Sequence, residues 1–512
     1  MLSFLSNKSD HPLANLKSAQ QLLDHLSKTD AVEVLNEIGH WIEALIDPAN
    51  EFRLDHQYAV LRMLDEAAHP YLLKIIHNYF AAIPPAEFQE KRLWAAMNAY
   101  FAFSELGYLH LIRGARDGGK GSSGFRDGVA LICARGIYAA SGRLECAAVR
   151  YAQLDPDLWI HLADFYDHAE ISKCQDDQLS LYAGSKVTTT VSSLLASVLA
   201  WNASVVGSLT PLDLHIAKCL IGNMEKSFST SEYLQEDSCL IFNLATPGSP
   251  LRLTGDGAMY PPSMRFANIG APAVYLDNLL KTLSKNLVTE EMNLGVAYGA
   301  EEVAGVARSL AAYFQTRQPV KRPPRRKIKM SVSVLNGFFN MVEETNVDLN
   351  LNDPVSGNWE VEDISANGLR CVLPEGFAGS VKIGTLVGLQ PEKALHWGVG
   401  IVRRLRRDEK NNLHVGVRIL SNKIESVVLH GHDGVNADVD YPALLLDRTG
   451  EQSGESWMLM KQETFSINRS PTMKLDGLNY LLLPLSLIEK GVDFDLVRYR
   501  KMEQDSSGDD EY

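Results

Sequence analysis

The chain has 512 residues, a formal net charge of −14 and a hydrophobic fraction of 46%. This length is too great for a single compact core and predicts about two to four domains. The composition excludes a largely disordered chain. The acidic balance argues against a nucleic-acid polymer as partner, because such proteins present a broad basic surface to the phosphates.

The cysteines and the apolar segments indicate where the protein works. Six cysteines are scattered without any CxxC pair, which predicts neither a zinc site nor a disulfide framework. The first residues lack the basic segment and long apolar run of a secretory signal. The uncharged stretch from Val187 to Leu212 is long enough to span a bilayer, but its Ser, Thr and Asn content favours a buried helix or helix pair. We therefore expect a cytoplasmic protein without a transmembrane segment.

Residues 1–243 have the pattern of an α-helical lobe. In residues 30–46 the apolar side chains recur at intervals of three and four, and Asp30 with Glu33 resembles a capping box. The same periodicity runs through residues 69–83, 91–115 and 156–173. A helical-hairpin array, such as the tetratricopeptide class, is one interpretation of this region, although no steady repeat of about 34 residues is present.

A segment rich in Gly and Pro, residues 244–262, interrupts the helical pattern. Helical periodicity returns in residues 273–287 and 301–314. The sequence therefore predicts that residues 244–316 form a second helical lobe or a continuation of the first, with the interrupting segment as the connection.

The pattern changes at Lys327 to short, β-branched stretches of roughly alternating polarity, which predict a small antiparallel barrel within residues 317–430. The predicted strands cover residues 327–334, 359–364, 369–373, 386–390, 397–405 and 414–420. After a loop rich in His, Gly and Asp, further strands at 441–447, 456–461, 479–485 and 494–500 predict a small C-terminal β extension over residues 431–500. Residues 501–512 read as an acidic, disordered tail. The fold class is multidomain α+β, with a large all-α N-terminal region.

A basic arm precedes the first predicted strand. Residues 321–329 gather six cations in nine positions of an otherwise acidic chain. Pro323 and Pro324 disfavour helical geometry, so the arm should be extended, with its arginines held apart. Such a strip is either a solvated linker or a site for an anion, since guanidinium groups pair with phosphate and with the edge of guanine.

A second motif, Asp363-x-Ser365-x-x-Gly368, follows on a predicted strand. Residues two apart on a strand face the same side, so the Asp363 carboxylate and the Ser365 hydroxyl can address one ligand. Gly368 would permit a turn with positive φ. A carboxylate and a hydroxyl beside a basic strip suit a nucleobase, because the carboxylate accepts from the N1 and N2 donors of guanine.

Together, Arg322-x-x-x-Arg326 and the later Asp363-x-Ser365-x-x-Gly368 resemble the PilZ domain, the bacterial cyclic di-GMP receptor module. The resemblance covers only about residues 320–430. It implies that Arg322 and Arg326 hold guanine and phosphate, that Asp363 and Ser365 bind the purine and a nearby phosphate, and that Gly368 shapes the turn.

Two features depart from the family pattern. Residues 336–358 lengthen the gap between the two motifs and need space as an extended hairpin or insertion. Arg325 offers a competing register for the arginine pair, so we count it among the candidate ligand-binding residues. Some members of the family keep the barrel without the ligand, and the intact motif here favours binding.

Other motifs are weaker. Residues 114–121 nearly spell a phosphate-binding loop, but Gly121 stands where a Ser or Thr is needed. His430 and His432 with Asp433 lack further ligands for a metal. No catalytic constellation is present, so we expect neither an enzyme nor a cofactor or metal.

The preferred interpretation is a cyclic di-GMP effector of bacterial signalling, in which binding at the barrel rearranges a helical region that contacts an unidentified protein partner. The alternative is a ligand-independent adaptor that uses both regions for protein contacts. Motility, adhesion, pilus assembly and polysaccharide export are all compatible with the family, so the downstream process stays open.

Overall fold

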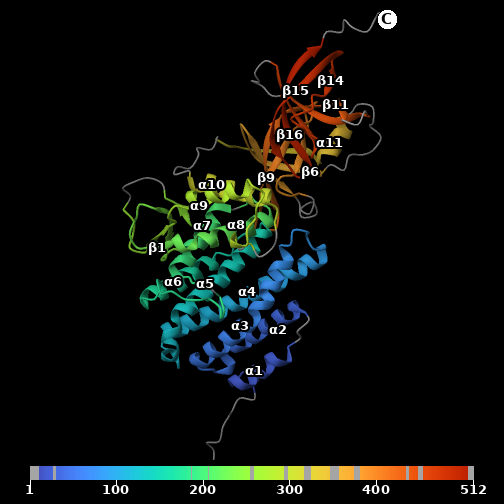
Figure 1. The fold of residues 1–512 in the computed structure, drawn as a ribbon. Coiled ribbons are helices and arrows are strands. Elements are labelled where there is room, and N and C mark those ends of the chain that lie inside the picture. The colour runs from blue at the N-terminus through green and yellow to red at the C-terminus, as the bar shows by residue number, and fades with distance from the viewer. Residues whose placement is uncertain are drawn as a thin grey trace, which may run out of the picture. The chain divides into compact units, whose positions relative to one another are not determined.

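The protein is described by a computed structural model over residues 11–26, 30–185, 187–205, 207–253, 259–292, 294, 298–315, 324–345, 357–373, 381–433, 437–447 and 454–504. The chain divides into two compact units (Figure 1). Unit 1 consists of Met1–Arg150 and Leu154–Pro319, and unit 2 consists of Tyr151–Gln153 and Val320–Tyr512.

Unit 1 is mainly helical, as the sequence predicts. Its helices are α1 (Leu16–His25), α2 (Ala31–Ile46), α3 (Leu54–Tyr79), α4 (Glu87–Arg116), α5 (Val129–Val149), α6 (Asp157–Ile171), α7 (Val191–Val205), α8 (Pro211–Met224), α9 (Pro272–Leu283) and α10 (Ala300–Gln315). One continuous hydrophobic core runs through them, from Leu13 to Ala311.

Local sequence signals explain where these helices begin. The Asp30 side chain accepts hydrogen bonds from the backbone N–H groups of Val32 and Glu33, which caps α2. Thr210 and Asp213 form a reciprocal capping box at α8, with Pro211 in the first turn.

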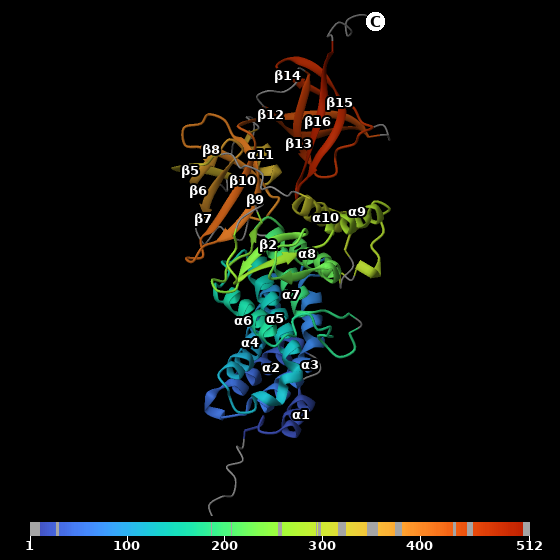
Figure 2. The same ribbon diagram turned by 90° about the vertical axis from the view of Figure 1, so that its left-hand side faces the viewer.

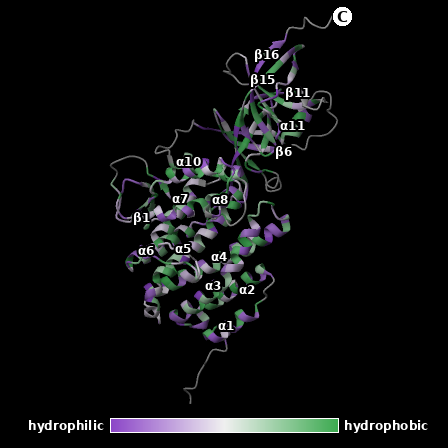
Figure 3. Cartoon of the chain, in the orientation of Figure 1, coloured by the Kyte–Doolittle hydropathy of each residue, from purple (hydrophilic) through white to green (hydrophobic). Residues whose placement is uncertain are grey.

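The uncharged stretch 187–212 contains α7, whose side chains are mostly apolar and buried (Figure 3). Within the described residues, none of the helices combines the length and the apolar character that crossing a bilayer requires.

A small sheet interrupts the region that the sequence predicts to be all helical. Its antiparallel strands are β1 (Ser229–Ser231), β2 (Ser238–Asn243), β3 (Leu251–Arg252) and β4 (Met264–Asn268), in the order β1-β4-β2-β3. Only β3 falls within the predicted connection 244–262, while β1 and β2 fall in the predicted first lobe and β4 in the second. The strands are too short for an alternating pattern to be recognised against the Gly and Pro residues between them. The burial of Leu240, Phe242 and Phe266 explains why they nevertheless form.

Unit 2 begins with the predicted barrel. Strands β5 (Arg326–Asn336), β6 (Gly357–Ser365), β7 (Gly368–Leu373), β8 (Leu386–Pro391), β9 (Gly398–Arg407) and β10 (Leu413–Ser421) close in the order β10-β7-β6-β5-β8-β9. All six strands coincide with predicted ones. Inward-facing residues such as Val332, Trp359, Cys371 and Val415 form its core.

The C-terminal region also forms a closed barrel, where the sequence predicts a small extension (Figure 2). Its strands are β11 (Lys423–Asp433), β12 (Ala437–Asp447), β13 (Glu455–Lys461), β14 (Thr472–Leu475), β15 (Leu478–Lys490) and β16 (Phe494–Gln504), in the order β11-β12-β13-β16-β15-β14.

Two expectations about this region are wrong. Strand β11 occupies most of the expected His- and Gly-rich loop. Its backbone N–H and C=O groups pair with β12 along the whole strand, which compensates for the weak strand preference of its glycines. The first residues of the expected acidic tail continue β16 up to Gln504, and the rest of the tail lies outside the described residues.

The predicted insertion between the two motifs starts with a helix, α11 (Phe338–Thr345), and residues 346–356 lie outside the described residues. Phe338 and Met341 of α11 enter a core to which both barrels contribute, including Leu386 of the first and Phe494 of the second. The backbone N–H of Phe338 donates to Asp493 at 2.7 Å. The two barrels and α11 therefore fold as one body.

Candidate functional site

The candidate site lies on the outer surface of the first barrel, on strands β5, β6 and β7. Antiparallel pairing places Lys327 of β5 opposite Asp363 of β6, and Arg370 of β7 opposite the same aspartate. Arg325 directly precedes β5. The sheet register thus brings cations from two strands to one carboxylate on the strand between them.

A β-bulge in β6 explains why two successive carboxylates reach the same arginine. The pairing of β6 with β7 shifts between Val361 and Asp363, so Glu362 is the extra residue. The Arg370 Nε lies 2.7 Å from Glu362 Oε2 and 3.1 Å from Asp363 Oδ2. Without the bulge, adjacent residues would point to opposite faces of the strand.

Asp363 is the central group of the site. Its side chain is 9% exposed, whereas those of Arg325 and Arg370 are each 46% exposed. Arg325 Nη1 donates to Asp363 Oδ1 at 2.7 Å. The carboxylate is therefore buried between two arginines that are themselves open to solvent.

Three further cations, Arg326, Lys327 and Lys329, are exposed on β5. Within the described part of the chain, none of them forms an ion pair. We use the name Asp363 face for Arg325, Arg326, Lys327, Lys329, Asp363 and Arg370. Arg322, the other predicted arginine, lies outside the described residues.

Ser365 and Gly368 are placed differently from the prediction. Ser365 Oγ donates to the carbonyl oxygen of Gly368 at 3.1 Å, so this hydroxyl closes the β6–β7 turn. Gly368 does not have a positive φ, and the expectation of a left-handed turn residue is wrong. The glycine is required by close approach instead, because a Cβ there would lie 2.5 Å from the carbonyl oxygen of Val417.

A cavity of about 680 Å³ adjoins the Asp363 face. It is lined by Lys327, Lys329, Glu362, Arg370 and His414, among others. This volume lies in the range of ligand pockets.

Sequence reasoning missed Arg370, Glu362 and His414, which come from three strands. The His414 ring nitrogens lie 3.1 Å from Glu362 and 3.2 Å from Asp408. Hydrogen bonds from the Asn412 side chain and from His414 hold the pKa of Asp408 at about 2. Only the strand register gathers these residues, and no linear motif marks them.

Residues of the two weaker motifs contact neighbouring parts of the fold. The carbonyl of Lys120 accepts from the backbone of Leu54, and Gly121 packs against Asp55 with φ 94°. His430 pairs with Asp440 at 2.6 Å, while the side chains of His432 and Asp433 are not among those described. The described residues contain no group of three His, Cys, Asp or Glu side chains arranged to hold a metal ion.

Comparison with known families gives one result for the helical part of the chain. Residues 17–231 match the model of a family described as the N-terminal domain of the cyclic-di-GMP receptor FimW. Apart from Tyr151–Gln153, the matched segment lies in unit 1, and it ends before the first barrel. No curated protein matches the chain significantly.

Proposed function

We propose that the protein is a cyclic di-GMP effector that binds its ligand on the Asp363 face of the first barrel. The observation that carries this proposal is a nearly buried carboxylate held between two half-exposed arginines, next to a strand that carries three exposed cations without an ion pair among the described residues. Guanine offers two adjacent donors to a carboxylate, and the phosphates of the ligand supply the anions that the spare cations lack.

The arginines on Asp363 do not prevent this binding. A carboxylate has about four lone-pair sites. Arg325 and Arg370 use one site on each oxygen, and the remaining sites can accept from a purine edge. Arg326, Lys327 and Lys329 then pair with phosphate, and each such charge-assisted bond relieves repulsion among neighbouring cations.

The family match supports the ligand class independently of the barrel. The family that matches residues 17–231 is named for a receptor of cyclic di-GMP, and this match rests on the helical unit alone. The basic arm and the aspartate motif, which resemble the PilZ domain, lie outside the matched segment. Two separate parts of the chain therefore support the same ligand.

The proposed output is a change in how the helical unit engages a protein partner. The arm that carries Arg322 joins unit 1 to β5 in the sequence. A ligand that neutralises cations on the arm would restrict it against the barrel and so alter the linkage between the two units.

Isothermal titration of the full chain with cyclic di-GMP tests the proposal. Saturable heat should be present in the wild type and lost in Arg326→Ala and in Asp363→Ala. Arg500→Ala is the matched control, since Arg500 is another exposed strand arginine without an ion pair among the described residues. Heat that is absent in the wild type, or unchanged in both site variants, would overturn the proposal and favour a ligand-independent adaptor.

The arginine register is tested separately. Arg322 and Arg326 are the pair in the preferred register, and Arg325 is the competitor because it already holds Asp363. Comparing Arg322→Ala with Arg325→Ala shows which side chain binds the ligand. If Arg322→Ala leaves the affinity unchanged while Arg325→Ala lowers it, the register with Arg325 is correct.

A further inference from the structure

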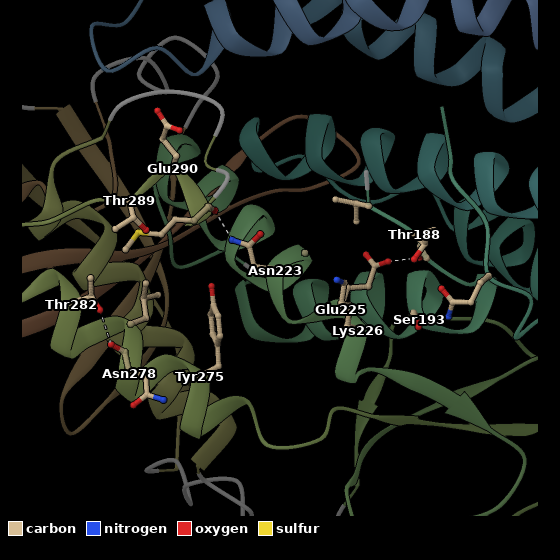
Figure 4. A pocket seen from close by; sticks show the side chains of 16 residues that line it. Thr188, Ser193, Asn223, Glu225, Lys226, Tyr275, Asn278, Thr282, Thr289 and Glu290 are labelled. Carbon is tan, nitrogen blue, oxygen red and sulfur yellow. Dashed lines mark hydrogen bonds between the residues drawn. The ribbon is translucent and has the colours of Figure 1, made fainter. Parts of the chain in front are cut away.

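Unit 1 contains a large cavity between α7, α8 and α9, lined by both polar and apolar groups, which we call the outer pocket (Figure 4). Its volume is about 1000 Å³, and most of its polar lining is uncharged. Hydroxyl and amide groups from three segments face it, including Thr188, Ser193, Asn223, Tyr275, Asn278 and Thr282. The Tyr275 side chain points toward Asn223 (Figure 4).

A smaller cavity continues from it into the helical core, and we call this the inner pocket. Its volume is about 220 Å³, and aromatic and aliphatic side chains such as Tyr138, Leu194 and Trp201 line it. Thr189, Gly222, Glu225 and Val187 line both cavities. The two pockets therefore meet at these residues, with the more polar chamber outside and the more apolar one within.

Two polar groups near the junction face the pockets: Glu225, which lines both, and Ser197, which lines the inner one. The Ser197 hydroxyl is buried and lies close enough to Glu225 to favour its charged form, but among the described residues it has no hydrogen bond of good geometry. Burial raises the pKa of Glu225 despite a hydrogen bond from Thr189 Oγ1. A buried hydroxyl whose contact with a carboxylate falls short of good hydrogen-bond geometry can still take a further partner.

The charges around the pockets exclude a strongly anionic ligand. The charged residues that line the outer pocket are Glu225, Lys226 and Glu290, with no cluster of cations. Lys218, in the inner pocket, is already paired with Glu145 at 2.8 Å. A second site for a dinucleotide with two phosphates would lack its counter-charges here.

We propose that the two pockets bind an extended peptide segment of a partner protein, with one large apolar side chain anchored in the inner pocket. The uncharged donors and acceptors of the outer pocket match a peptide backbone, which carries one donor and one acceptor per residue. At the junction, the Glu225 carboxyl accepts a backbone N–H and the Ser197 hydroxyl gains a partner. The apolar chamber provides the anchoring contact that dominates such recognition.

This proposal names the partner class for the helical unit, but it rests on unit 1 and does not require that the barrel bind cyclic di-GMP. An experiment can therefore disprove peptide binding by unit 1 without disproving cyclic di-GMP binding by the barrel, and the reverse. The probe is N-acetyl-L-phenylalaninamide, a capped residue with a peptide backbone and one aromatic side chain. N-acetylglycinamide, which lacks the side chain, is the comparison compound, and binding is measured by saturation-transfer NMR on the full chain.

Gly222 allows the junction to be blocked without strain. It lies in α8, and a Cβ added there meets no atom within 4 Å. Gly305 in α10 has the same property but does not line either pocket. Leucine has a higher helix propensity than glycine, so neither substitution should destabilise its helix. Gly222→Leu blocks the junction, whereas Gly305→Leu changes a helix without touching the pockets and serves as the control.

The phenylalanine amide should bind the wild type and Gly305→Leu equally, and should bind Gly222→Leu at least about tenfold more weakly because the added side chain occupies the junction. The glycine amide should give at least about tenfold weaker binding to the wild type. Equal binding to Gly222→Leu, or no binding to any variant, would overturn the proposal. A preference for 2-phenylethylamine over the neutral amide would also overturn it, because the site would then select a cation. The heat of cyclic di-GMP titration should be the same in Gly222→Leu as in the wild type.

Discussion

Each unit contains a buried aspartate bound by arginine, and the two environments differ in what surrounds the pair. Asp65 in unit 1 is 1% exposed and accepts from the hydroxyls of Tyr100 and Tyr108, each at 2.5 Å. Its arginine, Arg135, has a side chain that is only 2% exposed. Asp363 in unit 2 is nearly as buried, but both of its arginines are half-exposed.

This difference separates a structural cluster from a candidate binding site. The guanidinium group of Arg135 has partners on several sides. It forms ion pairs with Asp65 at 3.3 Å and Glu66 at 3.0 Å. It also donates to the Leu181 carbonyl at 2.8 Å and stacks on the Tyr182 ring. No face of that cluster is left for a ligand. The Asp363 face keeps solvent-accessible donors, so the same pair of residue types can serve recognition there.

The largest effect expected is on stability, from Arg135→Met. Removing one member of a buried pair leaves the Asp65 charge without compensation, which costs about 3–5 kcal/mol of unfolding free energy. Arg370→Met, on the exposed side of the comparison, should cost less than about 1 kcal/mol. Urea unfolding of both variants measures the difference. Equal losses would show that burial does not distinguish the two clusters.

The next effect comes from Gly368→Ala. The added Cβ would lie 2.5 Å from the backbone oxygen of Val417, so β7 and β10 would have to separate. Overpacking of this kind costs about 1–3 kcal/mol. Gly305→Ala is the control, because its Cβ meets no atom within 4 Å and alanine favours a helix. If Gly368→Ala unfolds like the wild type, the close approach of β7 and β10 is wrong.

The sequence is a better guide to the elements than to the assembly of the site. The strands of the first barrel are rich in β-branched residues and roughly alternate in polarity, so all of them coincide with predicted segments, and Asp30 marks the start of α2. The strands near residue 240 are short, and β11 carries glycines and histidines that resemble a loop. In both cases tertiary pairing outweighs the weak local signal.

The candidate site illustrates the same limit. Asp363 and Arg325 could be predicted because they belong to short linear motifs. The contact of Arg370 with Asp363 depends on the register of β6 against β7 and on a bulge at Glu362, neither of which a single sequence specifies. The motif indicates that Gly368 is constrained, but it cannot show why, because a close approach of strands and a left-handed turn both select glycine; the structure shows the close approach.

A third effect is a pH dependence in unit 1, at His215. Burial by itself lowers the pKa of this histidine, but its contacts with Cys219 and with Glu145, at 2.9 Å, raise it to about 10. The ordinary pKa of a histidine side chain is about 6.5. The stabilisation from the protonated ring is therefore complete below about pH 6.5 and is lost as the pH rises toward 10.

Between pH 7 and 9.5 the wild type should lose up to about 1.4 kcal/mol of unfolding free energy per pH unit at this site. His215→Gln lacks the titrating ring, so its stability should fall less steeply over the same range. Urea unfolding at a series of pH values compares the two slopes. Parallel slopes would contradict a protonated His215 in the folded protein.

The smallest effect on stability is expected from Asp363→Asn. This variant also tests most directly whether Asp363 differs in role from Asp65. The partners of Asp363 are half-exposed arginines, and pairs of that kind contribute less than about 1 kcal/mol, so the barrel should remain folded. Affinity for cyclic di-GMP should nevertheless fall at least about tenfold, because an amide offers guanine one acceptor where the carboxylate offers two. Asp476→Asn is the control, since Asp476 is exposed in the β14–β15 turn and its φ of 52° is one that Asn tolerates. A large loss of stability in Asp363→Asn would make Asp363 a structural residue like Asp65, and the contrast between the two aspartates would no longer support a binding site on the barrel.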